Sequence, residues 1–324
     1  MNTKEILSHL GSGGLTAFNT DTVPGIFAAY NDRAAADKIT ALKKSARGRT
    51  YQVFICDLGQ LDLLGIKSGK EEIRKFLPGK FSVLLETKLR MPHIVKDGKI
   101  SIRMMSSGLL KKVLNERGPL LATSFNESGK AFPRNYGKFS KEIMICEDLK
   151  VISRSPSTLI DIKKYGYDIL RPGSGDIGAT GAMTVIGSDH AGLEMKSEVK
   201  ETLHKYSIIV TDVGTFNGDS VDYPDIAHIV GKAVQKKKFP YGILICGTGI
   251  GMSIAVNRFK GVRGALCHNE NFARLARMHN DANVLVLSGR FLDKKILDPL
   301  ISTFFFTSFE AGRHAARIKK IEKV

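Results

Sequence analysis

The sequence predicts an α/β protein with two domains. The first is an α+β domain with a mixed, twisted sheet, and the second is a Rossmann-like α/β/α domain with a parallel sheet. The chain has 324 residues, more than one typical domain length. Residues 170–192, "LRPGSGDIGATGAMTVIGSDHAG", collect glycine, proline and small polar residues, as domain boundaries do. Strand-like and helix-like segments alternate regularly after this boundary. We therefore expect domains over residues 1–180 and 183–324.

The second half has the more regular pattern. Strands are predicted over residues 183–189, 207–214, 241–249, 262–268 and 282–289, and helices over 193–206, 223–237, from 253, over 270–280 and over 293–306. Such alternation is typical of a parallel sheet with helices on both faces. Ligands of these sheets bind at the carboxyl ends of the strands. We expect five residues at those ends: Asp189, Cys246, His268, His279 and Arg290.

The first half has a different pattern. A strand, a polar loop and a second strand are predicted within residues 13–32, a helix over 34–45, and further strands over 51–58, 81–89, 99–105 and 119–125. Because few helices separate these strands, the pattern favours an α+β fold in which parallel and antiparallel neighbours mix. We detect no internal repeat that would relate the two halves.

The chain is strongly basic. Its formal net charge is +17. Residues 1–180 hold 29 Lys and Arg against 18 Asp and Glu, a difference of +11, and residues 181–324 hold 20 against 14, a difference of +6. This balance favours partners that carry phosphate, either small molecules or nucleic acid. A solvated lysine-rich surface is the alternative explanation for each individual lysine.

Several classes of protein are disfavoured. The apolar runs are shorter than the roughly 20 residues of a membrane span. The N-terminus lacks the apolar core of a signal peptide, so we expect a cytoplasmic protein. The four cysteines, Cys56, Cys146, Cys246 and Cys267, lack the close-pair spacing of metal or redox motifs. We expect free thiols, with neither a disulfide nor a metal site.

The stretch "YGILICGTGIGMSIAVNRF" (241–259) is the most informative of the second half. Its G-x-G-x-G order differs from the G-x-G-x-x-G fingerprint of nicotinamide cofactors, which disfavours a dinucleotide site. A strand–glycine–helix turn instead directs backbone amides toward an anion. Cys246 lies at the rim of this turn, where a thiolate would gain from the same field. The sequence therefore predicts a base beside an oxyanion site, and the alternative is a small buried cysteine.

Other residues fit a phosphorylated substrate. Asp189 and His190 end the first strand of the second half, and Arg290 follows the fifth. Arg313 and Arg317 are one helical turn apart, so both face one direction, and paired arginines suit a phosphate. Helix capping explains Asp189 equally well, and a solvated surface explains the arginines.

The segments "GSDHAG", "DYPDIA", "ILICGTGIGMSIAVNRF", "MHNDANVLVLSGR" and "EAGRHAARI" resemble ribose-5-phosphate isomerase B in order and spacing. The resemblance covers 183–324. It implies interconversion of ribose 5-phosphate and ribulose 5-phosphate, a step of the pentose phosphate pathway, without a metal or organic cofactor. It also implies a homodimer in which each site is built across the subunit interface. Related isomerases act on six-carbon sugar phosphates, so that substrate class stays open.

The resemblance assigns roles residue by residue. It makes Cys246 the base that moves the proton between carbons 2 and 1, and His279 the acid that opens the furanose ring. The enediolate would be held by Gly247, Thr248, Gly249, Ile250 and Gly251. Sugar hydroxyls would be bound by Asp189, His190 and Asn280. The phosphate would be bound by Arg290, Arg313 and Arg317.

The first half gathers hydroxyl and basic groups around its strand ends. The segments are "FNTDTVPGI" (18–26), "LKKSARGRT" (42–50), "LLATSFNESG" (120–129), "SPSTLIDI" (155–162) and "ILRPG" (169–173). Such groups suit a polyanionic ligand such as ATP.

In this order the segments resemble the threonylcarbamoyl-AMP synthase family. The resemblance implies a nucleotidyltransferase that joins ATP, bicarbonate and L-threonine into threonylcarbamoyl-adenylate and releases pyrophosphate, with Mg²⁺ accompanying ATP. The product serves tRNA modification. By position, Thr22 would lie near threonine. The nucleotide and carboxylate site would be lined by Lys43, Arg49, Arg103, Ser124, Asn126, Ser157 and Arg171.

The basic motif of the first half departs from the family pattern. Ser45 and Ala46 replace the arginine and proline of that motif, and Leu77 replaces a tryptophan. Arg47 or Arg49 could supply the missing charge. An alternative also stays open for this half: a related class of double-stranded RNA binders shares the fold, so it could be a non-catalytic RNA-binding module.

Overall fold

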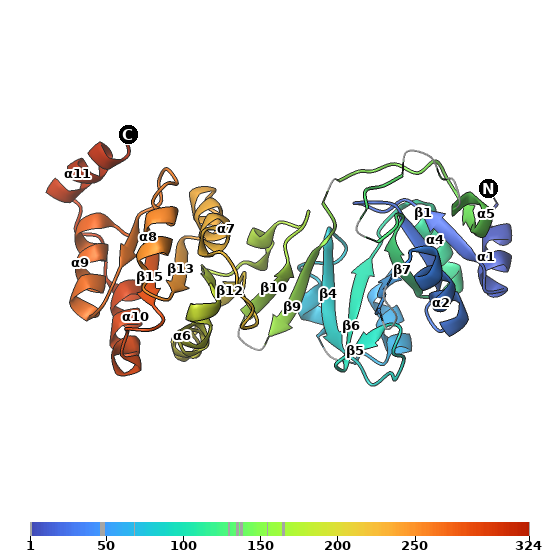
Figure 1. Ribbon diagram of the computed structural model, residues 1–324, viewed down its shortest axis with the longest axis horizontal. Helices are drawn as coiled ribbons and strands as arrows, with labels where there is room; N and C mark the ends of the chain where they lie inside the picture. Colours follow the sequence, from blue (N-terminus) through green and yellow to red (C-terminus); the bar gives the residue numbers. More distant parts are fainter. Residues whose placement is uncertain are drawn as a thin grey trace. The chain divides into compact units, whose positions relative to one another are not determined.

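A computed structural model describes residues 2–45, 49–67, 69–128, 130–133, 136, 139–153, 155–163 and 166–323. The chain divides into two compact units (Figure 1). Unit 1 comprises Met1–Ile162 and Arg171–Asp176, and unit 2 comprises Lys163–Leu170 and Ile177–Val324. In the part of the chain that is described, no helix is long and apolar enough to cross a bilayer.

Unit 1 is built on a mixed sheet, as the sequence predicts. Its strands are β1 (Leu15–Phe18), β2 (Gly25–Ala29), β3 (Gln52–Ile55), β4 (Phe81–Glu86), β5 (Val95–Lys96), β6 (Lys99–Met104), β7 (Leu120–Ser124), β8 (Ile143–Ile145) and β9 (Thr158–Lys163). They lie in the order β9-β4-β6-β3-β7-β2-β1-β8, and β5 pairs with β6. The pairs β1·β8, β3·β6 and β4·β9 are parallel, whereas β1·β2, β2·β7, β3·β7 and β4·β6 are antiparallel.

Helices accompany this sheet. They are α1 (Thr3–Gly11), α2 (Arg33–Leu42), the 3-10 helix η1 (Leu58–Leu64), α3 (Lys70–Ile73), α4 (Gly108–Arg117) and α5 (Phe139–Glu142). Helix α2 begins where the Asp32 side chain accepts a hydrogen bond from the Ala35 amide. One core cluster joins α1 and α4 to the sheet, and within it the rings of Phe18 and Phe54 each meet Phe27 edge-on.

Unit 2 has a wholly parallel sheet, which confirms the predicted Rossmann-like architecture. Its strands are β10 (Gly166–Arg171), β11 (Thr184–Ser188), β12 (Val210–Asp212), β13 (Tyr241–Cys246), β14 (Gly264–Leu266) and β15 (Val284–Ser288). They lie in the order β14-β15-β13-β11-β12-β10. All five neighbouring pairs are parallel.

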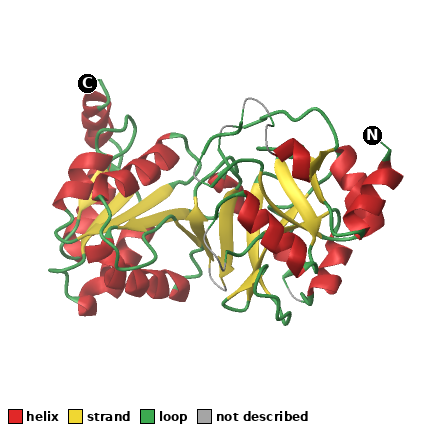
Figure 2. Ribbon diagram, turned by 45° about the vertical axis from the view of Figure 1, so that its right-hand side comes forward, coloured by secondary structure: helices red, strands yellow, loops and turns green. Residues whose placement is uncertain are grey.

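Helices cover both faces of the unit 2 sheet (Figures 1 and 2). They are α6 (Leu193–Lys205), α7 (Tyr223–Gln235), α8 (Ile250–Val256), α9 (Glu270–Asn280), α10 (Leu297–Phe306) and α11 (Arg313–Ile321), with 3-10 helices η2 (Ile177–Thr180), η3 (His190–Gly192) and η4 (Lys294–Ile296). Helices α6, α9 and α10 bury their apolar faces in one core cluster with β11, β13 and β15. Helices α7 and α8 pack together against β13.

Strand β10 begins just before the boundary that the sequence predicted at 170–192. Residues Gly166–Asp168 pair with Val210–Asp212 of β12, and the Lys200 ammonium is 2.8 Å from the Asp168 carboxylate. These contacts place 163–170 in unit 2, whereas the sequence-based division assigns them to residues 1–180.

Candidate active sites

In unit 2 the glycine loop places Cys246 next to a backbone donor. Cys246 ends β13 and is 5% exposed, and the Gly249 amide donates a hydrogen bond to its Sγ at 3.2 Å. Gly249 has φ of +80°, and a Cβ there would lie 2.4 Å from the Leu266 side chain, so the turn requires glycine. The Ile250 amide donates to the Thr248 hydroxyl. The sulfur therefore faces the start of α8.

Backbone hydrogen bonds bring three strand ends together around this loop. The Asp189 amide donates to the Ile245 carbonyl, and the Arg290 amide donates to the Gly247 carbonyl. The Asp189 carboxylate accepts from the Gly192 amide, so it also acts as the cap that the alternative explanation expected. A Cβ built at Gly247 would meet the Arg290 side chain at 3.4 Å. His190 follows Asp189 in η3, where its Nδ1 accepts from the Val221 amide.

The prediction that His279 lies at the carboxyl ends of the strands is wrong. His279 and Asn280 end α9, and the chain then enters β15, so both lie at its amino end. The register pairs Val284 with Gly242 and Ser288 with Cys246. The four residue steps from Val284 to Ser288 span about 13 Å at ~3.3 Å per residue. Within one chain, His279 and Cys246 therefore lie at opposite ends of these strands.

Helix α11 lies beside the end of α9 and carries Arg313 and Arg317. The Glu310 amide donates to the Met278 carbonyl and ties this segment to α9. The Glu310 carboxylate lies 3.5 Å from Nε2 of both His279 and His314, whose rings stack 4.2 Å apart. The predicted sugar-phosphate residues therefore form two groups, one around Cys246 and one around His279.

Sequence reasoning missed Glu310 and His314, although both stand in the quoted "EAGRHAARI". His314 is buried, and burial, followed by the charge of His279, lowers the pKa of its imidazole below the usual range. The ligand atoms of His279, Glu310 and His314 lie within 4.8 Å of one another. Two imidazoles and a carboxylate suit zinc. However, the Arg313 Nε lies 3.4 Å from His314 Nε2, and this cation opposes a metal.

In unit 1 Arg103 joins the polar loop to the sheet. Arg103 is 2% exposed; its Nη2 donates to the Thr22 hydroxyl at 2.8 Å and pairs with the Asp21 carboxylate. Its buried Nε has no partner among the described residues. Burial lowers the pKa of Arg103 below its usual range, Asp21 opposes this shift, and the charge of Arg171 adds to it.

Lys43 is also buried. Its ammonium donates to the carbonyls of Ser124 and Asn126, and to the Asn126 side chain at 2.8 Å. Burial, and then the charge of Arg49, lowers its pKa to about 7. The Ser124 hydroxyl donates to the same Asn126 oxygen. The structure thus brings the predicted trio of Lys43, Ser124 and Asn126 together.

Arg171 and Ser157 form a third contact. Arg171 Nη2 donates to the Ser157 carbonyl at 3.0 Å. The Ser157 hydroxyl lies 2.6 Å from the Ser82 hydroxyl. Sequence reasoning missed Ser82 because its strand has no polar motif. Burial, and then the charge of Arg49, lowers the pKa of Arg171. Electrostatic influence among Arg49, Arg171 and Arg103 indicates a cationic cluster suited to an anion.

Arg49 lies beside the position at which the basic motif lacks its arginine. Its Nη1 lies 3.4 Å from the Ser45 hydroxyl, the position where the family pattern has arginine, and 3.5 Å from that of Ser128. Ala46 and Arg47 lie outside the described residues. Leu77, in place of the tryptophan, is buried.

Comparison with known families matches each half separately. Residues 184–321 match the family described as Ribose/Galactose Isomerase, and residues 8–173 match the Sua5–YciO–YrdC family, described as Telomere recombination. The chain belongs to both families. The second match ends at 173, so β10 lies within the Sua5–YciO–YrdC segment by sequence, whereas all of β10 except Arg171 belongs to unit 2 by contacts.

Relatives of the isomerase half are close. A putative sugar phosphate isomerase of Rickettsia conorii is 49% identical over 138 residues, which are 43% of this chain and 96% of the relative. Ribose-5-phosphate isomerase B of Escherichia coli is 37% identical over 138 residues, 43% of this chain and 93% of the relative. A crystal structure of a ribose 5-phosphate isomerase from Thermotoga maritima has 48% identity and a TM-score of 0.43, and covers 44% of this chain and 99% of its own.

Proposed function

We propose that the chain is a bifunctional enzyme and that unit 2 interconverts ribose 5-phosphate and ribulose 5-phosphate. The observation that carries this is Cys246 at the end of β13, with its sulfur 3.2 Å from the Gly249 amide nitrogen. The thiolate is the base, and the loop amides stabilise the oxyanion. The names of the relatives support a pentose phosphate over a six-carbon substrate.

The chemistry balances without an added cofactor or metal. The Cys246 thiolate takes the proton from carbon 2 of the open-chain aldose. The electrons of that C–H bond form the C1=C2 double bond, and the carbonyl electrons move to O1. The thiol then returns the proton to carbon 1, while the O2 proton passes to O1. Residues 247–251 hold the enediolate. In the preceding ring opening the bond between C1 and the ring oxygen breaks, His279 donates a proton to the ring oxygen, and the C1 hydroxyl loses its proton to water as the aldehyde forms.

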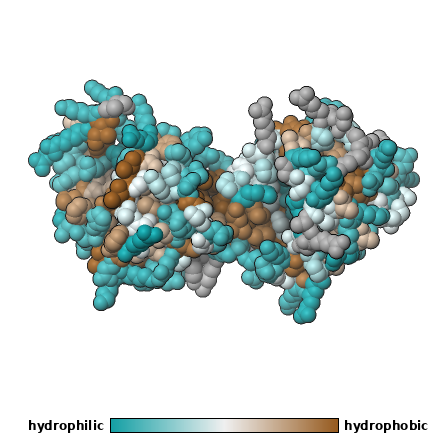
Figure 3. Space-filling view, viewed as in Figure 1, coloured by the Kyte–Doolittle hydropathy of each residue, from teal (hydrophilic) through white to brown (hydrophobic). Residues whose placement is uncertain are grey.

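The proposed site needs a second copy of the chain. His279 and Cys246 lie at opposite ends of β15 and β13. In a dimer the partner's cysteine would therefore be reached by the group of His279, Asn280, Arg313 and Arg317. Apolar side chains beside these elements support a homodimer: Ile250 and Ile254 of α8 are 54% and 57% exposed, and Phe272 of α9 is 55% exposed. Figure 3 shows exposed hydrophobic surface on unit 2, its left-hand end. Such exposure is typical of interaction sites.

Mixing two inactive variants tests the shared site. Cys246→Ser and His279→Gln each lack one essential group, so each homodimer should be inactive. Random mixing after co-expression should restore about a quarter of wild-type activity, because half of the dimers are mixed and each holds one intact site. Turnover of ribose 5-phosphate is the measurement. Activity that stays at the level of the single variants would contradict a site shared between subunits.

For unit 1 we propose synthesis of threonylcarbamoyl-adenylate for tRNA modification. The cluster of Lys43, Arg49, Arg103 and Arg171 supports this, because several cations with little counter-charge suit ATP and a carboxylate. Thr22 would lie near threonine. Asp21 is already paired with Arg103, so Mg²⁺ would be held chiefly by the phosphate oxygens of ATP.

In this reaction the threonine amine adds to bicarbonate, loses water and gives a carbamate. A carbamate oxygen then forms a bond to the α-phosphorus, and the bond from that phosphorus to the bridging oxygen breaks to release pyrophosphate. The cations stabilise charge on the phosphoryl oxygens and on the leaving group. Pyrophosphate release that depends on both threonine and bicarbonate tests the proposal.

ATP binding should take up a proton on Lys43. Its pKa of about 7 makes much of the amine neutral at pH 8 in the free protein, and a nearby polyphosphate raises that pKa by favouring the charged form. Calorimetric titrations in two buffers of different ionisation enthalpy should therefore report net uptake at pH 8. The uptake should disappear in Lys43→Met, and an equal uptake in that variant would contradict the assignment.

The basic charge of residues 1–180 supports a second candidate, a non-catalytic module that binds tRNA or double-stranded RNA. Salt-sensitive RNA binding without pyrophosphate release would favour it over the synthase.

A further inference from the structure

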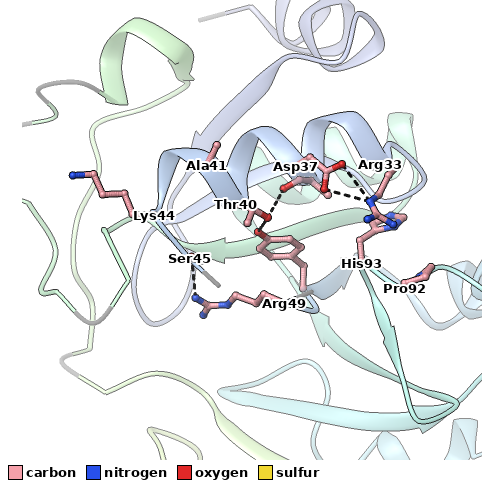
Figure 4. Close-up of a pocket in the computed structure, with 11 residues that line it drawn as sticks. Arg33, Asp37, Thr40, Ala41, Lys44, Ser45, Arg49, Pro92 and His93 are labelled. Atoms are coloured by element: carbon pink, nitrogen blue, oxygen red, sulfur yellow. Dashed lines mark hydrogen bonds and ion pairs between the residues drawn. The ribbon is translucent and has the colours of Figure 1, made fainter. Parts of the chain in front are cut away.

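A cavity of about 620 Å³ lies along α2 in unit 1 (Figure 4). Arg33, Lys44 and Arg49 line it, with Asp37 as the carboxylate among its lining residues. Three cationic side chains and one carboxylate thus line the cavity. The Arg33–Asp37 pair is 3.3 Å long, and its side chains are 62% and 65% exposed, so water screens it and Arg33 can bind a ligand at small cost.

The Thr40 and Tyr51 hydroxyls of the cavity lining already form hydrogen bonds within the protein. The Thr40 hydroxyl donates to the Ala36 carbonyl, so the Tyr51 hydroxyl, 2.7 Å away, donates to Thr40. The Tyr51 amide donates to the His93 carbonyl, and this hydrogen bond joins Tyr51 to the segment of the lining that contains His93. The two hydroxyls have their protons engaged within the protein, and recognition of a ligand falls to the arginines (Figure 4).

His93 adds an unsatisfied group. It is 8% exposed, and its Nε2 lies 2.8 Å from the Tyr30 carbonyl, so that nitrogen carries a proton. Its buried Nδ1 has no partner among the described residues. Because Nε2 carries the proton, Nδ1 is a lone-pair acceptor enclosed by protein, and His93 therefore offers no donor to an anion in the cavity.

Arg49 belongs both to this cavity and to the cationic cluster that it forms with Lys43, Arg103 and Arg171. It lines the cavity, yet its charge also reaches Lys43 and Arg171. A ligand that spans the two would have its most negative part in the cavity. In phosphoryl transfer the leaving group departs in line, away from the nucleophile, and therefore needs cations of its own.

We propose that the cavity along α2 binds the pyrophosphate part of ATP and retains pyrophosphate when it leaves. The inference rests on the proposed synthase function. Guanidinium groups match phosphate oxygens in pairs, and two of them line the cavity: Figure 4 shows Arg33 beside Asp37 and Arg49 beside Ser45. Arg33 then becomes a binding residue for the leaving group, outside the cluster around Lys43.

Calorimetric titration of the full chain with inorganic pyrophosphate tests this, with AMP titrated in parallel. Arg33→Ala should weaken pyrophosphate binding about tenfold, the effect of losing one charge-assisted contact, and leave AMP binding unchanged. Lys38→Ala is the matched control, because it removes a positive charge from the same helix at an exposed position outside the cavity lining. It should change neither affinity. Unchanged AMP binding in each variant reports that unit 1 is folded.

Equal pyrophosphate affinity in wild type and Arg33→Ala would overturn the proposal, as would equal weakening by Lys38→Ala. These outcomes are separable from failure of the synthase assignment, since binding is measured without turnover. A chain that releases no pyrophosphate from ATP yet binds it through Arg33 would refute the synthase reaction and retain the site. A chain that releases pyrophosphate from ATP, but whose pyrophosphate affinity does not change in Arg33→Ala, would retain the synthase reaction and refute the site.

Discussion

Cys246→Ser should lower kcat for ribose 5-phosphate by about 100-fold or more, the usual cost of losing a general base. Serine keeps the size of the side chain and can accept the Gly249 hydrogen bond. Its hydroxyl stays protonated at neutral pH, so it cannot take the carbon-bound proton. The Michaelis constant should change little, because phosphate and hydroxyl contacts come from other residues. Steady-state kinetics in both directions measure these values.

Cys267→Ser is the matched control. Cys267 is buried directly after β14, which β15 separates from β13, and burial raises the pKa of its thiol to about 12, so it stays neutral. Turnover in this variant should stay near the wild-type value once the folded fraction is equalised. Unchanged turnover in Cys246→Ser, or equal losses in both variants, would rule out Cys246 as the base.

The order of elements in unit 2 was predictable because each strand and helix there has its own apolar period. The arrangement of the site residues was less predictable. His279 stands next to a predicted strand in the sequence, but whether it lies at the amino or carboxyl end depends on the direction in which α9 returns. A helix that follows a parallel strand ends at the amino edge, which moves His279 away from Cys246.

Long-range pairing explains the other differences. Residues 166–168 pair with β12, and Lys200 supplies a counter-charge for Asp168. Neither partner is near in sequence. Burial of Lys43 likewise depends on carbonyls some 80 residues away, so the sequence indicated only a basic side chain at a helix end.

Asp212→Asn should lower the free energy of unfolding of unit 2 by about 3–5 kcal/mol, the range for breaking a buried ion pair. Asp212 is 1% exposed. Its two oxygens accept from the ammonium groups of Lys196 at 2.8 Å and Lys200 at 2.9 Å, and one also accepts from the Gly214 amide. The Lys196 side chain is only 3% exposed, so the variant leaves a buried ammonium without its counter-charge. Urea unfolding of the isomerase unit measures the loss.

The pH dependence distinguishes an unpaired charge from lost packing. Burial lowers the pKa of Lys196 below 10.5 even beside Asp212, and loss of that carboxylate lowers it further. Between the folded and unfolded pKa values the unfolded chain binds more protons, so stability rises with pH in that window. The deficit of Asp212→Asn should therefore shrink as pH rises toward 10. A constant deficit would indicate packing, and Asp298→Asn, whose ion pair with Lys205 is exposed, should cost less than about 1 kcal/mol.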